Sequence, residues 1–188
     1  MREAGLALIA ALLASAVPAL AVERFEARGT VELAFAPADE PEALVLDVIG
    51  RASRSLHVQA YVFTSKPVAR ALVAAHRRGV RVQVLADAKM NARETGNAIP
   101  LLLEAGVPVA FETEYAAAHN KVIVADAEGP SCAVLTGSYN FTWSAANRNA
   151  ENVIVLRDNC PLARAYLANW ERHRAAATPV LGLPFEPR

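Results

Sequence analysis

The sequence predicts one α/β domain with a mixed β-sheet flanked by helices. Three observations support this prediction. Segments rich in β-forming residues alternate with segments whose apolar residues recur at helical spacing, which is typical of a sheet with helices on its faces. The 188 residues suffice for one domain with a proper core. The chain shows no internal repeat and no low-complexity linker, so we expect a single domain.

The first 21 residues have the pattern of a secretory signal peptide. Arg2 precedes an apolar run over 5–13, and residues 19–21 form the small-x-small ending of a cleavage site. We therefore predict a signal peptide over 1–21 and an exported protein, periplasmic or secreted. Glu3 weakens the basic start, so a membrane-anchored protein with an uncleaved segment is the alternative, although the run is short for a membrane span.

The first half of the predicted domain alternates strands and helices. Residues 31–35 and 80–86 alternate apolar and polar side chains, which is the period of a half-buried strand. Pro41 suits the first turn of a helix, and Gly79 suits the end of the next one. The same criteria predict strands over 55–63 and 107–111 and helices over 41–51, 66–78 and 98–104.

The second half is expected to contain a β-hairpin, because Gly129 and Pro130 form a turn signal between two strand segments. The domain should fill 22–178, and the three prolines in 179–188 indicate a loosely ordered tail. The expected elements are strands over 120–125, 133–136 and 152–156 and helices over 142–147 and 161–174.

Composition limits the partners and metals that the chain can take. It carries 19 basic and 19 acidic residues, so any basic surface for nucleic acid must be local. Cys132 and Cys160 have no further ligands at chelating spacing, so the sequence predicts no metal site. In an exported protein these two cysteines favour a structural disulfide, with two separate buried thiols as the alternative.

Polar side chains gather where three of the predicted strands begin or end. His119 and Lys121 share a strand face, Ser138 and Asn140 follow the next strand, and Glu151 opens the last one. Together they supply an imidazole, a cation, hydroxyl and amide donors and a carboxylate, which are the groups needed for displacement at phosphorus. Each segment alone is a weak signal, because a turn, a helix cap or a strand-end charge has the same pattern. Their ordered co-occurrence is harder to obtain by chance.

These segments in this order resemble the HKD motif of the phospholipase D superfamily. The resemblance lies in His119-Asn120-Lys121, four residues, Asp126, then Gly137-Ser138-Tyr139-Asn140 and Glu151-Asn152. Further segments are similar to the single-motif, Nuc-like branch of bacterial endonucleases: 61–65, 78–82, Asp87, Tyr115 and Trp170. The spacer between Asp126 and Gly137 is longer than is usual in the family, and it contains the predicted hairpin tip.

The resemblance implies a phospholipase D/nuclease-like sandwich that cleaves phosphodiesters without a metal or other cofactor. With one motif per chain, it also implies a homodimer whose two copies share one site. One His119 would attack phosphorus to form a phosphohistidine, and the second copy's His119 would protonate the leaving oxygen. Lys121, Ser138 and Asn140 would bind the phosphate oxygens, and Glu151 would orient a histidine.

Two motif residues are expected to be structural. Asp126 has the opposite strand parity to His119, and Gly137 ends a strand. If the strands beside Cys132 and Cys160 are antiparallel neighbours, the two cysteines lie at the same end of the sheet and can form a disulfide.

The sequence therefore predicts an exported, nonspecific endonuclease that hydrolyses DNA, with RNA as a further substrate. One alternative is a phospholipase D-type hydrolase that acts on phospholipid head groups. A second is a non-catalytic binding module on the same fold, which is disfavoured because no candidate catalytic residue is missing.

Other residues have two interpretations or none. Residues 87–93 lie in a polar loop that either borders the site or is simply solvated. Trp143 fits either the core or a surface on which a base stacks. His57 is expected to pack within its strand, and the sequence assigns no role to His76 or His173.

Overall fold

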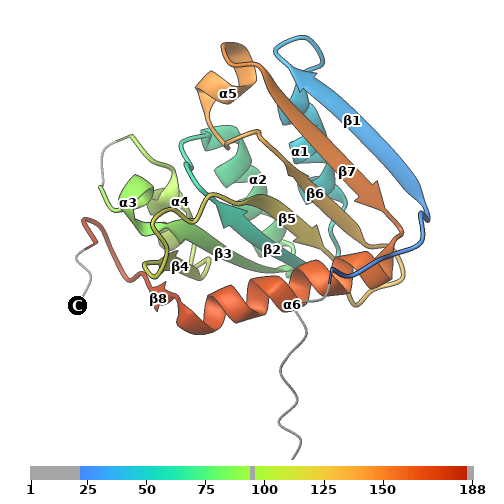
Figure 1. Ribbon diagram of the computed structural model, residues 1–188. Helices are drawn as coiled ribbons and strands as arrows, with labels where there is room; N and C mark the ends of the chain where they lie inside the picture. Colours follow the sequence, from blue (N-terminus) through green and yellow to red (C-terminus); the bar gives the residue numbers. More distant parts are fainter. Residues whose placement is uncertain (1–21, 94–95, 186–188) are drawn as a thin grey trace, which may run out of the picture.

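The computed structural model describes residues 22–93 and 96–185, which form one mixed sheet with helices on both faces (Figure 1). The predicted fold class is confirmed. The strands are β1 (Thr30–Ala36), β2 (Ser55–Ala60), β3 (Arg81–Asp87), β4 (Val109–Glu112), β5 (Lys121–Ala125), β6 (Ala133–Gly137), β7 (Glu151–Arg157) and β8 (Thr178–Pro179). The helices are α1 (Pro41–Arg51), α2 (Lys66–Arg77), α3 (Ala88–Asn91), α4 (Ile99–Glu104), α5 (Trp143–Asn147) and α6 (Cys160–Ala176).

The strand order in the sheet is β1-β7-β6-β5-β2-β3-β4-β8. The β2–β3 and β3–β4 pairs are parallel, because α2 and α4 return the chain to the same edge. The remaining neighbours are antiparallel. Strand β5 is therefore central, and both of its ends are surrounded by the ends of other strands.

The two faces of the sheet pack against different helices. Helices α1, α2 and α4 cover one face, and the main core contains Ile123 of β5. Helix α6 runs along the other face, where Val122 and Val124 pack against its Leu167 (Figure 1). Because successive strand residues point to opposite faces, β5 contributes to both cores and is fully buried.

Two differences from the sequence-based boundaries have a common cause. Strand β2 ends at Ala60 rather than at 63, and the loop expected after β3 contains α3. Asn91 in α3 accepts a hydrogen bond from the backbone N–H of Phe63 at 3.0 Å and donates to the carbonyl of Tyr61 at 2.7 Å. The side chain of Asn91 thus replaces the strand partner that this segment would otherwise need.

The sequence predicts a loosely ordered tail over 179–188, but in the structure the start of this segment packs against the sheet. Thr178 and Pro179 pair with β4, and Val180 is buried in the main core. The N–H of Phe185 donates to the carbonyl of Ala92 at 2.9 Å, so the chain is held as far as residue 185. The predicted signal peptide over 1–21 lies outside the described residues. None of the helices within 22–93 and 96–185 is long and apolar enough to cross a membrane.

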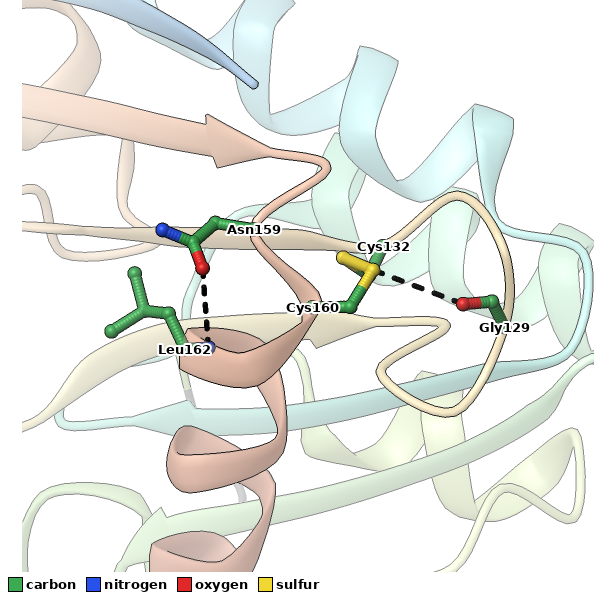
Figure 2. Close-up of a disulfide and its surroundings, with 5 residues drawn as sticks. All are labelled: Gly129, Cys132, Asn159, Cys160 and Leu162. Atoms are coloured by element: carbon green, nitrogen blue, oxygen red, sulfur yellow. Dashed lines mark hydrogen bonds between the residues drawn. A yellow bond between two sulfur atoms is a disulfide. The ribbon is translucent and has the colours of Figure 1, made fainter. Parts of the chain in front are cut away.

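A disulfide lies at the end of the sheet where β6 and α6 begin. It joins Cys132 to Cys160, whose Cα atoms are 5.6 Å apart (Figure 2). Strands β6 and β7 are antiparallel neighbours, which is the arrangement in which the sequence indicated that the cysteines could meet. Beside the bridge, Oδ1 of Asn159 accepts a hydrogen bond from the N–H of Leu162 at 3.4 Å and caps α6. The bridge therefore ties the β5–β6 hairpin to the start of α6.

Candidate active site

The three polar segments found in the sequence converge at one end of the sheet. The register places the start of β5 beside the end of β2, and the start of β7 beside the ends of β6 and β1. His119 lies two residues before β5, Ser138 directly follows β6, and Glu151 opens β7. Residues that are far apart in the sequence are therefore neighbours at this end of the sheet.

His119 is exposed, and its ring lies against two other side chains. Its Nδ1 atom is 3.0 Å from Nζ of Lys121, which also donates to the carbonyl of His119 at 2.8 Å. The ring of Tyr61 also contacts the imidazole, with ring centroids 4.3 Å apart, and Nζ of Lys121 is 4.6 Å from the Tyr61 centroid. The Tyr61 ring therefore contacts the imidazole and stabilises the ammonium group by a cation–π interaction.

Lys121 is buried although it is a cation, with 4% of its surface exposed. Burial lowers the pKa of Lys121 below its ordinary value, and the negative charge of Glu151 opposes this shift. A buried ammonium group is costly unless an anion pairs with it, so the site favours an anion at this position.

Ser138 and Glu151 form a hydrogen-bonded pair across the ends of β6 and β7. The Ser138 hydroxyl donates to Oε2 of Glu151 at 2.5 Å and accepts from the N–H of Asn152 at 3.1 Å. Asn149 donates to the other carboxylate oxygen at 3.0 Å. Within one chain the Glu151 carboxylate thus contacts Ser138 and Asn149, and the structure does not bring it to the His119 ring.

Gly137 directly precedes Ser138, and Asn140 lies two residues after it. Gly137 has a φ of 148°, and a Cβ atom there would lie 2.2 Å from the carbonyl oxygen of Asn152. Only glycine fits this close approach of two strands. Oδ1 of Asn140 is buried without a hydrogen-bond partner in the part of the chain that the structure describes. Few buried polar atoms are left in this state in folded proteins, and a functional role is one explanation for them.

The loop after β3, for which the sequence left two interpretations, borders the site and supports it. Oδ2 of Asp87 accepts a hydrogen bond from the N–H of Ala118 at 2.8 Å, directly before His119. Lys89 donates to the carbonyl of Ala116 at 3.0 Å, in the same segment that leads to His119. The Asn91 side-chain amide donates to the backbone carbonyls of Asp87 and Tyr61. One buried amide thus connects Asp87, which holds the backbone before His119, with Tyr61, which contacts the His119 ring.

Asp126 lies at the opposite end of β5 from His119. Its carboxylate accepts hydrogen bonds from the N–H groups of Ser53, Arg54 and Ser55 and from the Ser53 hydroxyl, at 2.7–3.0 Å. Burial raises the pKa of Asp126, but these donors outweigh burial and hold it below its ordinary value. The residue thus closes the turn before β2 and does not reach the site.

The remaining histidines lie outside the site. His57 packs in β2 against the ring of Trp170, with ring centroids 4.8 Å apart, and burial lowers its pKa to about 4. His173, to which the sequence assigned no role, contacts the buried carboxylate of Glu112 at 2.5 Å. Within the described ranges, no three His, Cys, Asp or Glu side chains are grouped so that they could hold a metal ion.

Comparisons with known proteins relate the chain to a family of known fold. Residues 45–174 match the family model described as cardiolipin synthase, PLD-like domain. The chain is 36% identical over 153 residues to a protein named phospholipase D from Rickettsia prowazekii, a match that covers 81% of this chain and 72% of the relative. It is 37% identical over 129 residues to a mitochondrial cardiolipin hydrolase from Xenopus laevis, covering 69% of this chain and 58% of that protein. The crystal structure of Nuc from Salmonella typhimurium, a phospholipase D family member, superimposes with a TM-score of 0.75 at 30% identity, covering 81% of this chain and 99% of Nuc.

Proposed function

The chain belongs to the phospholipase D superfamily and is a phosphodiester hydrolase, and from this premise we propose that it is an exported endonuclease. It cleaves DNA or RNA without a metal, at a site shared by two subunits. The observation that carries this proposal is the convergence of His119, Lys121 and the Ser138–Glu151 pair at one end of the sheet. The resemblance to the Nuc-like endonuclease branch and the structural similarity to Nuc support nucleic acid as the substrate.

The hydrogen bonds of the free site indicate how a phosphate would prepare the nucleophile. A neutral His119 ring that accepts from Lys121 at Nδ1 carries its proton on Nε2, so Nε2 is then a hydrogen-bond donor and has no lone pair with which to attack phosphorus. A phosphate bound by Lys121 and Ser138 would draw these groups away from His119 and Glu151. The ring can then take the other tautomer, donate Nδ1–H to Glu151 and present Nε2 as the nucleophile.

The reaction has two displacements at phosphorus. Nε2 of His119 forms a bond to phosphorus while the bond to the leaving oxygen breaks, and the partner subunit's His119 gives that oxygen a proton. The partner subunit's His119 then removes a proton from water, the water oxygen attacks phosphorus, and the bond to Nε2 breaks. Lys121 and Asn140 stabilise the charge on the non-bridging oxygens in both steps.

An exposed apolar face next to the site supports the homodimer. Val31, Leu33 and Phe35 alternate on the edge strand β1 and are 58%, 55% and 52% exposed. Phe35 pairs with Asn152, whose side-chain amide donates to the Ser138 hydroxyl at 3.3 Å, so this face reaches the site. A second copy that covers it would bring the two His119 side chains toward one shared site, and burial of the three side chains would stabilise the dimer.

Export is supported by the pattern of residues 1–21 and by the disulfide. Disulfides persist in oxidising compartments such as the periplasm and the extracellular space, and they are rare in the cytosol. The proposal therefore includes removal of 1–21 and formation of the Cys132–Cys160 bridge after transport. If 1–21 is retained, the same domain is membrane-anchored.

The names of two relatives favour a second candidate function. The relatives named phospholipase D and cardiolipin hydrolase point to a phospholipid phosphodiester as the substrate. The same nucleophile, cation and donors serve either substrate, because the group that reacts is a phosphodiester in both.

One assay separates these candidates. Purified protein is incubated with plasmid DNA, with RNA and with phosphatidylcholine vesicles in excess EDTA, beside the His119→Ala variant. We expect His119-dependent cleavage of nucleic acid in the presence of the chelator. Cleavage of lipid alone would favour the second candidate. Loss of all activity in EDTA, restored by a divalent ion, would contradict the metal-independent mechanism.

A Leu33→Glu variant tests the shared site. A charge in the apolar face should separate the subunits in sedimentation experiments and remove the activity, while Leu181→Glu, at an exposed position elsewhere, should change neither. An active Leu33→Glu monomer would contradict the dimer model.

A further inference from the structure

Trp143, which the sequence assigned to either the core or a stacking surface, is exposed. It is the first residue of α5, and 62% of its surface is accessible. The indole forms one wall of a cavity of about 260 Å³ between α5 and the start of α2. The cavity is lined by Glu42, Thr64, Ser65, Lys66, Pro67, Trp143, Ala146 and Asn147.

This cavity adjoins the candidate active site through the backbone. The carbonyl of Phe141 accepts hydrogen bonds from the N–H groups of Thr64 and Ser65 at 2.9 and 2.8 Å, which joins the two walls. Thr64 is three residues after Tyr61, whose ring contacts His119, and Phe141 directly follows Asn140. The segments that line the cavity thus continue directly into those that carry Tyr61 and Asn140 of the candidate site.

The walls are fixed by hydrogen bonds that do not involve the indole ring. The Thr142 hydroxyl accepts from the N–H of Ala145 at 3.1 Å, and the Asn147 amide donates to the carbonyl of Trp143 at 2.9 Å. Across the cavity, Ser65 caps α2 and donates to Glu42 at 2.8 Å. The backbone that carries the indole is thus held in place while the ring itself faces solvent.

We propose that this cavity binds one nucleobase of the strand whose phosphate lies at His119, with Trp143 stacked on the base. This inference rests on the proposed nuclease function. Stacking on an aromatic side chain is the common way to hold a base of any sequence, and the cavity is smaller than the roughly 300–1,000 Å³ typical of drug-sized ligands. The exposed cation Lys66 lies at the rim, where the adjacent phosphates of the strand would run, and Glu42 is held by Ser65.

The chemistry of the lining favours a base over a lipid chain. Two hydroxyls, an amide and two charged side chains line the cavity together with Trp143, Pro67 and Ala146. The edge of a base can hydrogen-bond with the Thr64 hydroxyl or the Lys66 ammonium group, which an acyl chain cannot do.

The binding test uses the fluorescence of Trp143. The chain has two tryptophans, and Trp170 is buried with its N–H bonded to the carbonyl of Val58, so a ligand that quenches emission contacts Trp143. In the His119→Ala background, a single-stranded oligothymidine should quench emission, and an abasic strand of equal length should not. Measured by the anisotropy of a fluorescein-labelled oligothymidine, Trp143→Ala should weaken binding by about 5- to 150-fold, and Trp143→Phe should restore most of it.

A kinetic test with the active protein separates this inference from the proposed function. Trp143→Ala should lower kcat/KM for the oligothymidine by the same factor and leave cleavage of the abasic strand unchanged. Phe25→Ala, which removes a partly exposed aromatic ring outside the cavity lining, should change neither rate. If Trp143→Ala cleaves both strands like the unmodified protein, the base site is wrong and the nuclease function stands. If the unmodified protein cleaves neither strand, the nuclease function fails. A blue shift of emission with phosphatidylcholine vesicles, without quenching by the oligothymidine, would assign the cavity to lipid and overturn the proposal.

Discussion

The two ends of strand β5 differ in how their polar groups are satisfied. At one end, the Asp126 carboxylate accepts four hydrogen bonds from residues 53–55. At the other end, the Lys121 ammonium group is buried beside an imidazole and a tyrosine ring, and the buried Oδ1 of Asn140 has no partner among the described residues.

This difference assigns a structural role to Asp126 and a chemical role to Lys121, although both belong to the same short motif. A carboxylate whose oxygens are fully hydrogen-bonded gains little from a ligand, so the Asp126 end contributes stability. A buried cation that pairs with no carboxylate among the described residues gains much from an anionic ligand, so the Lys121 end is suited to binding a phosphate. The disulfide lies at the Asp126 end, which adds covalent support where no chemistry is expected.

The largest effect should come from the nucleophile. His119→Ala removes the group that would form the bond to phosphorus, and we expect kcat to fall by about 10⁴-fold or more. Because His119 is exposed, the free energy of unfolding should change by about 0.5 kcal/mol or less. Phosphodiester hydrolysis and urea unfolding measure the two quantities. A comparable loss of activity in His76→Ala, on the surface of α2, would show that the effect is not specific to the site.

Glu151→Gln should have the next largest effect. It removes the carboxylate proposed to hold the His119 ring, and we expect kcat to fall by about 10³-fold. It also removes the charge that raises the pKa of Lys121 against burial, so Lys121 should lose its proton at lower pH. The alkaline limb of the kcat/KM profile should therefore move to lower pH. An unmoved limb would contradict this coupling, and Asn149→Ala, which leaves the charge in place, is the control.

Removal of the disulfide tests whether the Asp126 end of β5 contributes stability and not chemistry. Replacing Cys132 and Cys160 by serine frees a segment of 28 residues, and loop-closure entropy predicts a loss of about 3–4 kcal/mol of stability. The activity of the folded fraction should be unchanged, because the site is at the opposite end of the sheet. The check is urea unfolding of the variant and of the unmodified protein with and without dithiothreitol. Equal stability of all four samples would contradict a stabilising role.

Much of the fold could be predicted because the local signals are strong. Helix boundary residues predicted both ends of α1 correctly, and strand alternation predicted each end of β3 to within one residue. The HKD-like order of His119, Ser138 and Glu151 predicted a common site because adjacent antiparallel strands bring their ends together.

The supports of the site could not be predicted, because their partners are distant in the sequence. Asn91 and Asp87 reach Tyr61 and Ala118, which are 30 and 31 residues away. The contacts of Glu151 could not be predicted either, since the choice between a histidine and Ser138 depends on side-chain packing at the strand ends. A buried asparagine in a polar loop gives no periodic signal, so only the folded chain shows its role.

Asp126→Asn should have the smallest effect and sharpen the contrast with His119. The amide keeps one acceptor but turns N–H groups toward backbone donors, so we expect a loss of about 2–3 kcal/mol of stability with little change in kcat of the folded protein. Because the pKa of Asp126 is lower in the folded chain than its ordinary value of 3.8, its contribution is full above that value and is lost as the pH falls through the folded pKa. The stability gap between the two proteins should therefore narrow in acid. Unfolding at neutral and at acidic pH measures this, with Asp39→Asn as an exposed control. A variant with native stability and no activity would instead place Asp126 in the chemistry and remove the distinction between the two ends of β5.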